Sequence, residues 1–452
     1  MAQPFELCIQ GQVRYANKHG IPFYAVNTGH GSTTSQTRFD GIQIDLSILP
    51  SGENLPRGQT AWIQGGSTVE VTVDELWGQG YVTTTGGAGC PGILGVGLGG
   101  GHGLLQGFHG LVSDNFVAFN MVLANGRAIT VSESFYSDLF WAMRGAGHSF
   151  GIVTSAEMRV YPRSDRDWSF KLYIWTQDNI EPVLGELIRM REDGEPRDLA
   201  FNFGSYALYP GLGTSEIRQP YLPHLPRPSP LSEAQPYLAP FYAIPALITQ
   251  NGSAPYNLIP RVTGAGADSP QCERGRTYMH YSSYLQEWNV TAQRTIYNLF
   301  AENIATNPTA FARAAVLMGD YKHDAVAQVD AASSAYPWRD RRLLKYTYPP
   351  LSVSEDRKLT ENVSNVVINY TPDPSLDDFA LTWARRTKEL WDGGQPGIPG
   401  AYYVNYAAGD ESPESVYGYE PWRMQRLRAL KVKYDPFGRF SYYNPIPIRR
   451  GR

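Results

Sequence analysis

The sequence is poor in charge and has no long apolar run. Its 452 residues include 43 acidic and 39 basic side chains, and charged residues make up only 18% of the chain. The net charge is −4 and no basic block stands out, so we expect no nucleic-acid partner. No stretch of about 18 consecutive apolar residues occurs, so we expect no transmembrane helix and no membrane partner.

Cysteine is also scarce, with Cys8, Cys90 and Cys272 the only three. An odd and sparse set predicts that no disulfide framework holds this fold and that Cys90 is a small buried thiol. No CxxC pair or His/Cys ligand spacing indicates zinc, so we expect no metal site. The N-terminus lacks the basic start, apolar middle and small-residue cleavage site of a signal peptide, and the compartment stays open.

Length and hydrophobic pattern predict the number of domains and the helices and strands of the chain. A chain this long predicts two or three domains. Helical periodicity and strand-like alternation each recur along it. The patterns predict helices over 5–19, 137–143, 176–191, 284–305, 375–391 and 422–433, and strands over 21–26, 41–46, 60–64, 69–73, 116–123, 128–131, 152–160, 169–174, 364–370 and 401–406.

Three glycine turns, at 28–32, 86–103 and 147–151, lie within about 130 residues of one another. Glycine lets backbone approach a bound molecule closely, and its exposed N–H groups can hold phosphate oxygens. The second segment is too rich in glycine to be an ordinary helix or strand. Within it, residues 95–100 fit GxGxxG, but they lack the preceding strand and the later acid of a dinucleotide fold.

Four groups of residues follow one another in a recognisable order. They are Phe23-Tyr24-Ala25-Val26-Asn27-Thr28-Gly29-His30-Gly31; Leu98-Gly99-Gly100-Gly101-His102-Gly103 with Gly110-Leu111 and Asp114-Asn115; Asp138 through Thr154; and Tyr403-Val404-Asn405-Tyr406 with Leu430 through Pro436 and Asn444. Jointly they resemble the FAD-linked oxidases of the vanillyl-alcohol oxidase and p-cresol methylhydroxylase (PCMH) superfamily. The likeness is strongest to the berberine-bridge-enzyme-like and 6-hydroxy-D-nicotine-oxidase-like branch found in fungi.

The resemblance implies an α+β fold. A PCMH-type FAD-binding domain of two α/β subdomains would span residues 1–162, and a substrate domain with an antiparallel sheet covered by helices would span 163–395. Residues 396–452 would form a C-terminal berberine-bridge-like segment that returns to the FAD domain. Relatives carry one or two strands before the helix expected at 5–19, so the first domain is expected to be N-terminally short.

The resemblance also implies an FAD cofactor bonded through its 8α-methyl group to His30. Some relatives add a second bond through a cysteine. A gap-free alignment puts Ala88 at that position and Cys90 two residues late, so we expect a single bond, although a two-residue deletion would align Cys90. The residues expected at the cofactor are Asn27, Thr28, Gly29, His30, Gly31, Ser32, Gly89, Cys90, Gly99, Gly100, Gly103, Asp114, Asn115, Gly147, Gly151, Ile152, Val153, Asn405 and Asn444.

A flavin takes up hydride at N5, and the protein positions the substrate beside it. In several relatives a tyrosine of this C-terminal motif is the base, which implies Tyr406 or Tyr403 here. On a strand over 401–406 the two would face opposite ways, so only one should meet the flavin. Its site should lower a pKa that is ordinarily near 10. His102 and His148, in glycine turns, could also touch flavin or substrate.

The tyrosine-rich, weakly charged middle of the chain indicates a small aromatic or polyketide-like substrate. The leading hypothesis is therefore an FAD-dependent oxidase of a secondary metabolite, with O2 as acceptor. Two other classes stay open: a flavin-free binding or scaffold protein, and an NAD(P)-dependent dehydrogenase that uses residues 95–100. The sequence leaves the oligomeric state open.

Overall fold

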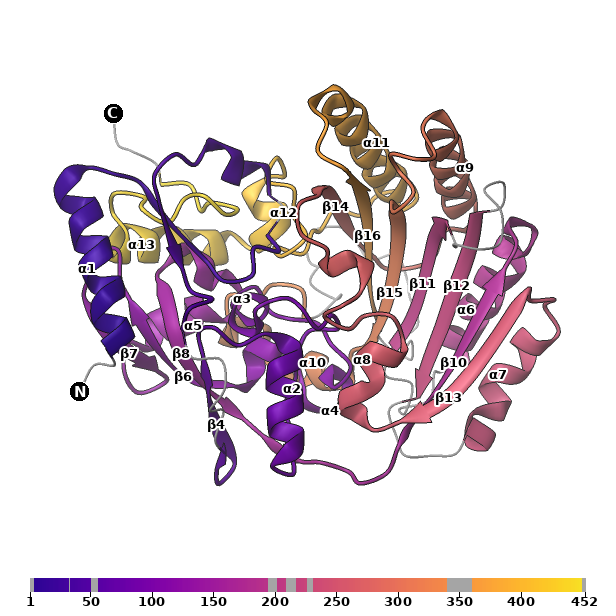
Figure 1. Ribbon diagram of the computed structural model, residues 1–452, viewed down its shortest axis with the longest axis horizontal. Helices are drawn as coiled ribbons and strands as arrows, with labels where there is room; N and C mark the ends of the chain where they lie inside the picture. The colour runs from indigo at the N-terminus through magenta and orange to yellow at the C-terminus, as the bar shows by residue number, and fades with distance from the viewer. Residues whose placement is uncertain are drawn as a thin grey trace.

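The computed structural model describes residues 4–31, 33–49, 56–193, 201–208, 217–225, 231–339 and 360–448. Two antiparallel sheets dominate this α+β fold, one of five strands and one of seven (Figure 1). Two smaller two-stranded sheets join them. Within the described residues, no helix combines the length and apolarity needed to cross a membrane.

The N-terminal unit is a helix packed on a parallel strand pair. Ile9, Val13 and Ala16 recur at helical spacing, and all three are buried against Phe23 and Ile44. The chain then runs directly from the first strand into the glycine turn of His30. The elements are α1 (Pro4–His19), β1 (Phe23–Val26) and β2 (Ile42–Asp45).

The five-stranded sheet has the order β3-β4-β8-β6-β7, and α13 returns to it from the far end of the chain (Figure 1). Helices α3 and α5 pack on the same core. The elements are β3 (Pro56–Arg57), β4 (Thr60–Gln64), α2 (Val69–Gly78), β5 (Tyr81–Val82), α3 (Ile93–Leu98), α4 (Gln106–His109), β6 (Phe116–Val122), β7 (Ala128–Ser132), α5 (Ser137–Ala146), β8 (Ile152–Arg159), β9 (Tyr161–Pro162), α12 (Pro413–Tyr417) and α13 (Pro421–Tyr434).

Two predictions for this region are wrong. Residues 69–73 are not a strand, because α2 begins at Val69, where the Thr68 side chain caps it by accepting a hydrogen bond from the Val71 amide. The glycine-rich stretch does contain a helix, α3, whose Ile93, Leu94 and Leu98 are buried. Its burial in the core outweighs the low helix propensity of glycine.

The seven-stranded sheet has the order β13-β10-β12-β11-β15-β16-β14, with every described pair antiparallel. Helices α6, α9 and α11 share its core (Figure 1). The helix predicted from 284 begins only at Val290, because residues 284 and 285 end β14. The elements are β10 (Trp168–Trp175), α6 (Ile180–Glu192), β11 (Phe201–Leu208), β12 (Ile217–Leu225), α7 (Gln235–Tyr242), β13 (Ile248–Ala254), α8 (Ile259–Val262), β14 (Thr277–Leu285), α9 (Val290–Thr306), β15 (Ala315–Lys322), α10 (Asp324–Gln328), β16 (Thr360–Tyr370) and α11 (Pro374–Gly393).

Candidate active site

A cavity of about 510 Å³ opens where segments from both ends of the chain meet. Its walls come from β1 and the following turn, from the glycine-rich stretch, from the start of β8 and from the C-terminal segment. Much of the lining is apolar or aromatic, including Tyr24, Phe39, Tyr442 and Tyr443. Such a cavity suits a flat organic ring.

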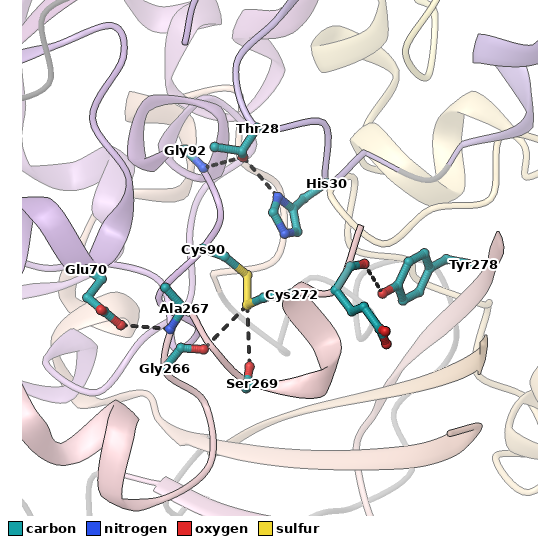
Figure 2. Close-up of a disulfide and its surroundings, with 11 residues drawn as sticks. Thr28, His30, Glu70, Cys90, Gly92, Gly266, Ala267, Ser269, Cys272 and Tyr278 are labelled. Atoms are coloured by element: carbon teal, nitrogen blue, oxygen red, sulfur yellow. Dashed lines mark hydrogen bonds between the residues drawn. A yellow bond between two sulfur atoms is a disulfide. The ribbon is translucent and has the colours of Figure 1, made fainter. Parts of the chain in front are cut away.

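His30 lies on the wall formed by the turn after β1. Its Nδ1 is 2.9 Å from Oγ1 of Thr28, which also accepts a hydrogen bond from the Gly92 amide at 3.0 Å (Figure 2). Partial loss of solvent, together with the nearby Arg274 charge, lowers the pKa of His30. The imidazole is therefore neutral at neutral pH and keeps the lone pair that a covalent bond to carbon requires.

A disulfide joins Cys90 to Cys272 beside this histidine, which corrects the expectation of a free thiol at Cys90 (Figure 2). Ligand atoms of His30 and both cysteines lie within 4.8 Å of one another. Because the two sulfurs are bonded to each other, neither offers a thiolate to a metal ion. Cys8 is free and exposed.

The disulfide belongs to a wider contact between the glycine-rich stretch and residues 256–272. The Gly89 amide donates to the Ala265 carbonyl at 2.8 Å, and the Ala267 amide donates to Glu70 of α2 at 2.7 Å (Figure 2). These bonds fasten a segment of the larger sheet region to the wall of the cavity.

The structure divides the residues predicted at the cofactor into two sets. Ser32 lies outside the described residues. Those that line the cavity are Asn27, Thr28, Gly29, His30, Gly31, Gly151, Ile152, Val153 and Asn405. Those that do not line it are Gly89, Cys90, Gly99, Gly100, Gly103, Asp114, Asn115, Gly147 and Asn444.

Several residues of the second set serve packing. A side chain on Gly99 would overlap the Asn405 amide, and one on Gly100 would press into the Tyr336 ring. Asp114 forms an ion pair with Arg339, whose Nη1 donates to its Oδ2 at 2.8 Å and whose guanidinium is fully buried. These residues hold the turns behind the cavity wall in place.

Asn115 and Asn444 also hold neighbouring backbone. The Asn115 side chain donates to the Leu111 carbonyl at 2.9 Å, and the Asn444 side chain donates to the Val404 carbonyl at 2.8 Å. Thr33 in turn donates to the Asn444 side chain at 3.1 Å. The two ends of the chain are thus fastened together beside the cavity.

Both candidate tyrosines line the cavity, because residues 401–406 are not the predicted strand. They form a turn in which the Tyr406 amide donates to the Tyr403 carbonyl at 2.8 Å. The argument that only one of them could face the flavin therefore fails. The Tyr403 hydroxyl oxygen accepts hydrogen bonds from the Gly101 amide at 2.9 Å and from Asn405 at 2.8 Å.

Burial raises the pKa of Tyr406 and, together with the neighbouring Tyr406 ring, that of Tyr403. This is opposite to the lowering expected for a base. His102 and His148 also line the cavity. Burial, helped by the Lys431 charge, lowers the pKa of His148 to about 3, and its Nε2 lies 2.8 Å from the Tyr417 hydroxyl.

Two buried polar atoms of the lining have no hydrogen-bond partner among the described residues: Oδ1 of Asn27 and Nε of Arg439. Unpaired buried groups are costly, so they indicate an occupant that pairs with them. An amide oxygen and a guanidinium suit the polar edge and the phosphates of a flavin nucleotide. The residues present therefore fit FAD.

Sequence patterns did not predict Arg439, Tyr442 or Tyr443 as lining residues. Neither the glycine turns nor the tyrosine motif includes them. The aromatic run Phe440 to Tyr443, placed just before Asn444, was the available signal.

Comparisons with known proteins show the class of protein to which the chain belongs. A family described as an FAD binding domain matches residues 8–132. The FAD-linked oxidoreductase anuG of Penicillium roqueforti is 43% identical over 435 residues, which cover 96% of this chain and 81% of that protein. The FAD-linked oxidoreductase OXR2 of Pyricularia oryzae is 39% identical over 96% of this chain and 81% of that protein.

Solved structures share the fold. Chitooligosaccharide oxidase superposes with a TM-score of 0.74 at 20% identity, over 98% of this chain and 90% of that one. A berberine-bridge-enzyme-like protein of Physcomitrella patens gives a TM-score of 0.76 at 20% identity, over the same shares of the two chains. The relatives of about 40% identity show that the chain is an FAD-dependent oxidoreductase. The chain belongs to the family of FAD-linked oxidoreductases.

Proposed function

We propose that this enzyme oxidises a small aromatic or polyketide-like secondary metabolite, with O2 as the final acceptor. The observation that carries the proposal is the aromatic cavity with a neutral His30 on one wall and Tyr403 and Tyr406 on another. Charged side chains are few in its lining, which favours a neutral, flat substrate. FAD, when bound, supplies the hydride acceptor.

We propose a single covalent bond, from His30 to the 8α-methyl group of the flavin. Two observations support this. The His30 imidazole is held by Thr28 with its pKa lowered, and the Cys90 sulfur is already bonded to Cys272. The cavity-lining residues named above would contact the cofactor, and those before residue 163 would belong to a domain that we propose to span residues 1–162.

The chain's own residues would orient the substrate and move a proton. Tyr406 and Tyr403 can hydrogen-bond a substrate hydroxyl or amine inside the cavity. Their raised pKa values make each a poor base on its own at neutral pH. We propose that residues 163–395 form the substrate domain and that residues 396–452 complete the cofactor site.

The covalent bond is tested on the purified protein. Its yellow flavin absorbance should remain with the protein after acid precipitation, and His30→Ala should release it to the supernatant. His19→Ala, at the exposed end of α1, is the matched control and should keep the colour. Colour released by acid from the wild type would reject the bond, whereas colourless protein would favour a flavin-free binding role.

The reaction is tested by anaerobic mixing with benzyl alcohol, 4-hydroxybenzyl alcohol and related aromatic alcohols. Bleaching of the flavin absorbance, followed by peroxide formation when air is admitted, is the expected result. Bleaching without peroxide would indicate a dehydrogenase with another acceptor. No bleaching by any compound of the series would reject the aromatic-alcohol assignment.

A further inference from the structure

The disulfide of Cys90 and Cys272 lies beside the imidazole of His30, and the three side chains form a compact cluster (Figure 2). A ring nitrogen of His30 and the two sulfurs all lie within 4.8 Å of one another. His30 is exposed and both cysteines are half-buried, so small ions can reach the cluster from solvent. Two sulfurs and one imidazole nitrogen are a donor set that zinc and other thiophilic ions prefer.

The backbone spacing of the two cysteines suits a metal ion as well as a disulfide. Their Cα atoms are 5.9 Å apart. In a tetrahedral zinc site, two thiolates that each lie about 2.3 Å from the metal are about 3.8 Å from each other. Rotation of the reduced side chains about their Cα–Cβ bonds brings the sulfurs to that separation, and the backbone keeps its place.

Contacts other than the disulfide hold the two cysteine-bearing segments together. The Gly89 amide donates to the Ala265 carbonyl at 2.8 Å, and the Ala267 amide donates to Glu70 at 2.7 Å. Glu70 also forms an ion pair with Arg261 at 2.7 Å. Because these bonds do not depend on the disulfide, both thiols should stay beside the imidazole when the sulfurs are reduced.

Polar neighbours are already placed to orient the imidazole and one of the sulfurs. Nδ1 of His30 lies 2.9 Å from Oγ1 of Thr28, which leaves Nε2 for a metal ion. The Ser269 hydroxyl lies 3.4 Å from Sγ of Cys272 and can donate to a thiolate there. Ser269 is buried. Hydrogen bonds of this kind commonly fix the ligands of metal ions in proteins.

We propose that the reduced, flavin-free chain binds one zinc ion, or another thiophilic divalent cation, through Cys90, Cys272 and Nε2 of His30. A water molecule would complete the tetrahedron, as in zinc sites with three protein ligands. The two thiolates cancel the charge of a divalent cation. The complex therefore adds no net charge beside Arg274, the cation whose charge acts on His30.

Reduction of the disulfide comes before metal binding. A thiol reductant such as glutathione supplies two electrons and two protons, so the sulfur–sulfur bond of the protein breaks while two reductant thiols become one disulfide. The incoming cation then displaces one proton from each cysteine thiol and forms two metal–sulfur bonds and one metal–nitrogen bond. The reverse exchange, with a disulfide as oxidant, removes both thiolates and releases the ion.

Metal binding should delay the proposed flavin bond, and this consequence rests on the proposed function. In a metal-bound His30, the lone pair of Nε2 is shared with the ion, and Nδ1 carries the hydrogen that faces Thr28. Neither ring nitrogen then offers a lone pair to a carbon atom of the flavin. The chain should acquire its tether only after the ion has left.

Metal binding is tested on flavin-free protein from riboflavin-starved cells, in a Cys8→Ser background that removes the exposed third thiol. After reduction and removal of the reductant, titration with Cd2+ should produce the ultraviolet thiolate-to-cadmium absorption and saturate at one ion per chain. The same protein with its disulfide intact should bind none. Circular dichroism should show that the reduced chain keeps its fold, and loss of the fold would overturn the proposal, because the ligands would no longer be held together.

Variants of the three ligands identify the site. Cys90→Ser, Cys272→Ser and His30→Ala should each weaken Cd2+ binding to the reduced protein by at least about 100-fold, because each removes one ligand. His30→Ala is the most informative of them, since it leaves both thiols in place. His19→Ala, at the exposed end of α1, is the matched control and should bind as the parent does. Binding that His30→Ala leaves unchanged, or equal binding by the oxidised parent, would overturn the site.

The delay is tested by adding FAD to the reduced protein with and without Zn2+. At about ten times its Kd, zinc leaves about a tenth of the chains with a free imidazole, so acid-stable flavin should appear about tenfold more slowly. A chelator should restore the rate, and Cys90→Ser should be insensitive to zinc. An unchanged rate with zinc bound would overturn the delay. Protein that gains no acid-stable flavin under any condition would reject the proposed tether, and the cadmium titration would still judge the metal site.

Discussion

At the scale of single residues, burial controls the chemistry of this site more than charge does. The same loss of solvent that raises the pKa of Tyr403 and Tyr406 lowers that of His148. In each case the uncharged form is favoured. Apart from Arg439, the cavity therefore presents mainly neutral hydrogen-bonding groups to a bound molecule.

His148 should make the fold sensitive to acid. Its pKa is about 3 in the folded protein against an ordinary value of 6.5, so the unfolded chain binds a proton between these values that the folded chain does not. The free energy of unfolding should therefore fall as pH drops below about 6.5, by up to about 1.4 kcal/mol per pH unit from this group.

His148→Gln can still bond the Tyr417 hydroxyl but cannot titrate, so its loss of stability on acidification should be smaller. Urea unfolding at about pH 7 and about pH 5 measures the difference. Equal losses in variant and wild type would contradict the assignment. Burial lowers the pKa of His280 to about 4, so this residue also contributes to the pH dependence of the free energy of unfolding, in the variant and in the wild type alike.

The positions of residues with a distinctive backbone or side-chain chemistry, such as glycine in turns or histidine and tyrosine in motifs, were predictable from sequence alone. The turn of His30 and the tyrosine motif both lie at the cavity, as their residues indicated. The ion pair of Asp114 was not predictable, because its partner Arg339 is 225 residues away. An ion pair closed by tertiary folding leaves no local pattern.

At the scale of elements, too, local patterns were predictable from sequence and long-range contacts were not. The apolar positions Leu7, Val13 and Ala16 predicted a helix over 5–19, and α1 forms there, although Leu7 is exposed and Ile9 is the residue buried beside Val13 and Ala16. Val69, Val71 and Val73 alternate like a strand, yet the Thr68 cap starts a helix there. The pairing of Cys90 with Cys272 spans 182 residues, and three cysteines gave no basis for it.

The disulfide should be measurable by counting thiols. Protein denatured without reductant should titrate one thiol per chain, that of Cys8, and three after reduction. Cys272→Ser should lower the free energy of unfolding by about 2–4 kcal/mol, because a long loop is no longer closed in the unfolded state. Cys8→Ser, at an exposed site, is the control and should change little. Three thiols without reductant would contradict the disulfide.

At the scale of the whole molecule, bound cofactor should stabilise the folded protein. The cavity joins the β1 turn, the glycine-rich stretch, β8 and the C-terminal segment, so an occupant that contacts all four resists unfolding of each. The buried side chains that pack on the two sheets fall into two separate clusters.

Adding FAD to flavin-free His30→Ala protein should therefore raise its Tm. At a free concentration about 100 times Kd, the gain is about 2.7 kcal/mol. NAD+ at the same concentration should have no effect, because residues 95–100 fall in α3 and the turn after it and do not follow a strand as in a dinucleotide fold. Stabilisation by NAD+ but not by FAD, followed by differential scanning fluorimetry, would contradict the site.

One consequence for biosynthesis follows from the hydrogen bond between Thr33 and Asn444 and from the aromatic residues up to Tyr443 that line the cavity. The ribosome makes the turn of His30 roughly 400 residues before it makes the opposite wall, since Thr33 and Asn444 are 411 residues apart. The flavin pocket cannot close on a nascent chain. Cofactor capture must await synthesis of residues 439–443, and a chain that stops before them would lack this wall of the flavin pocket.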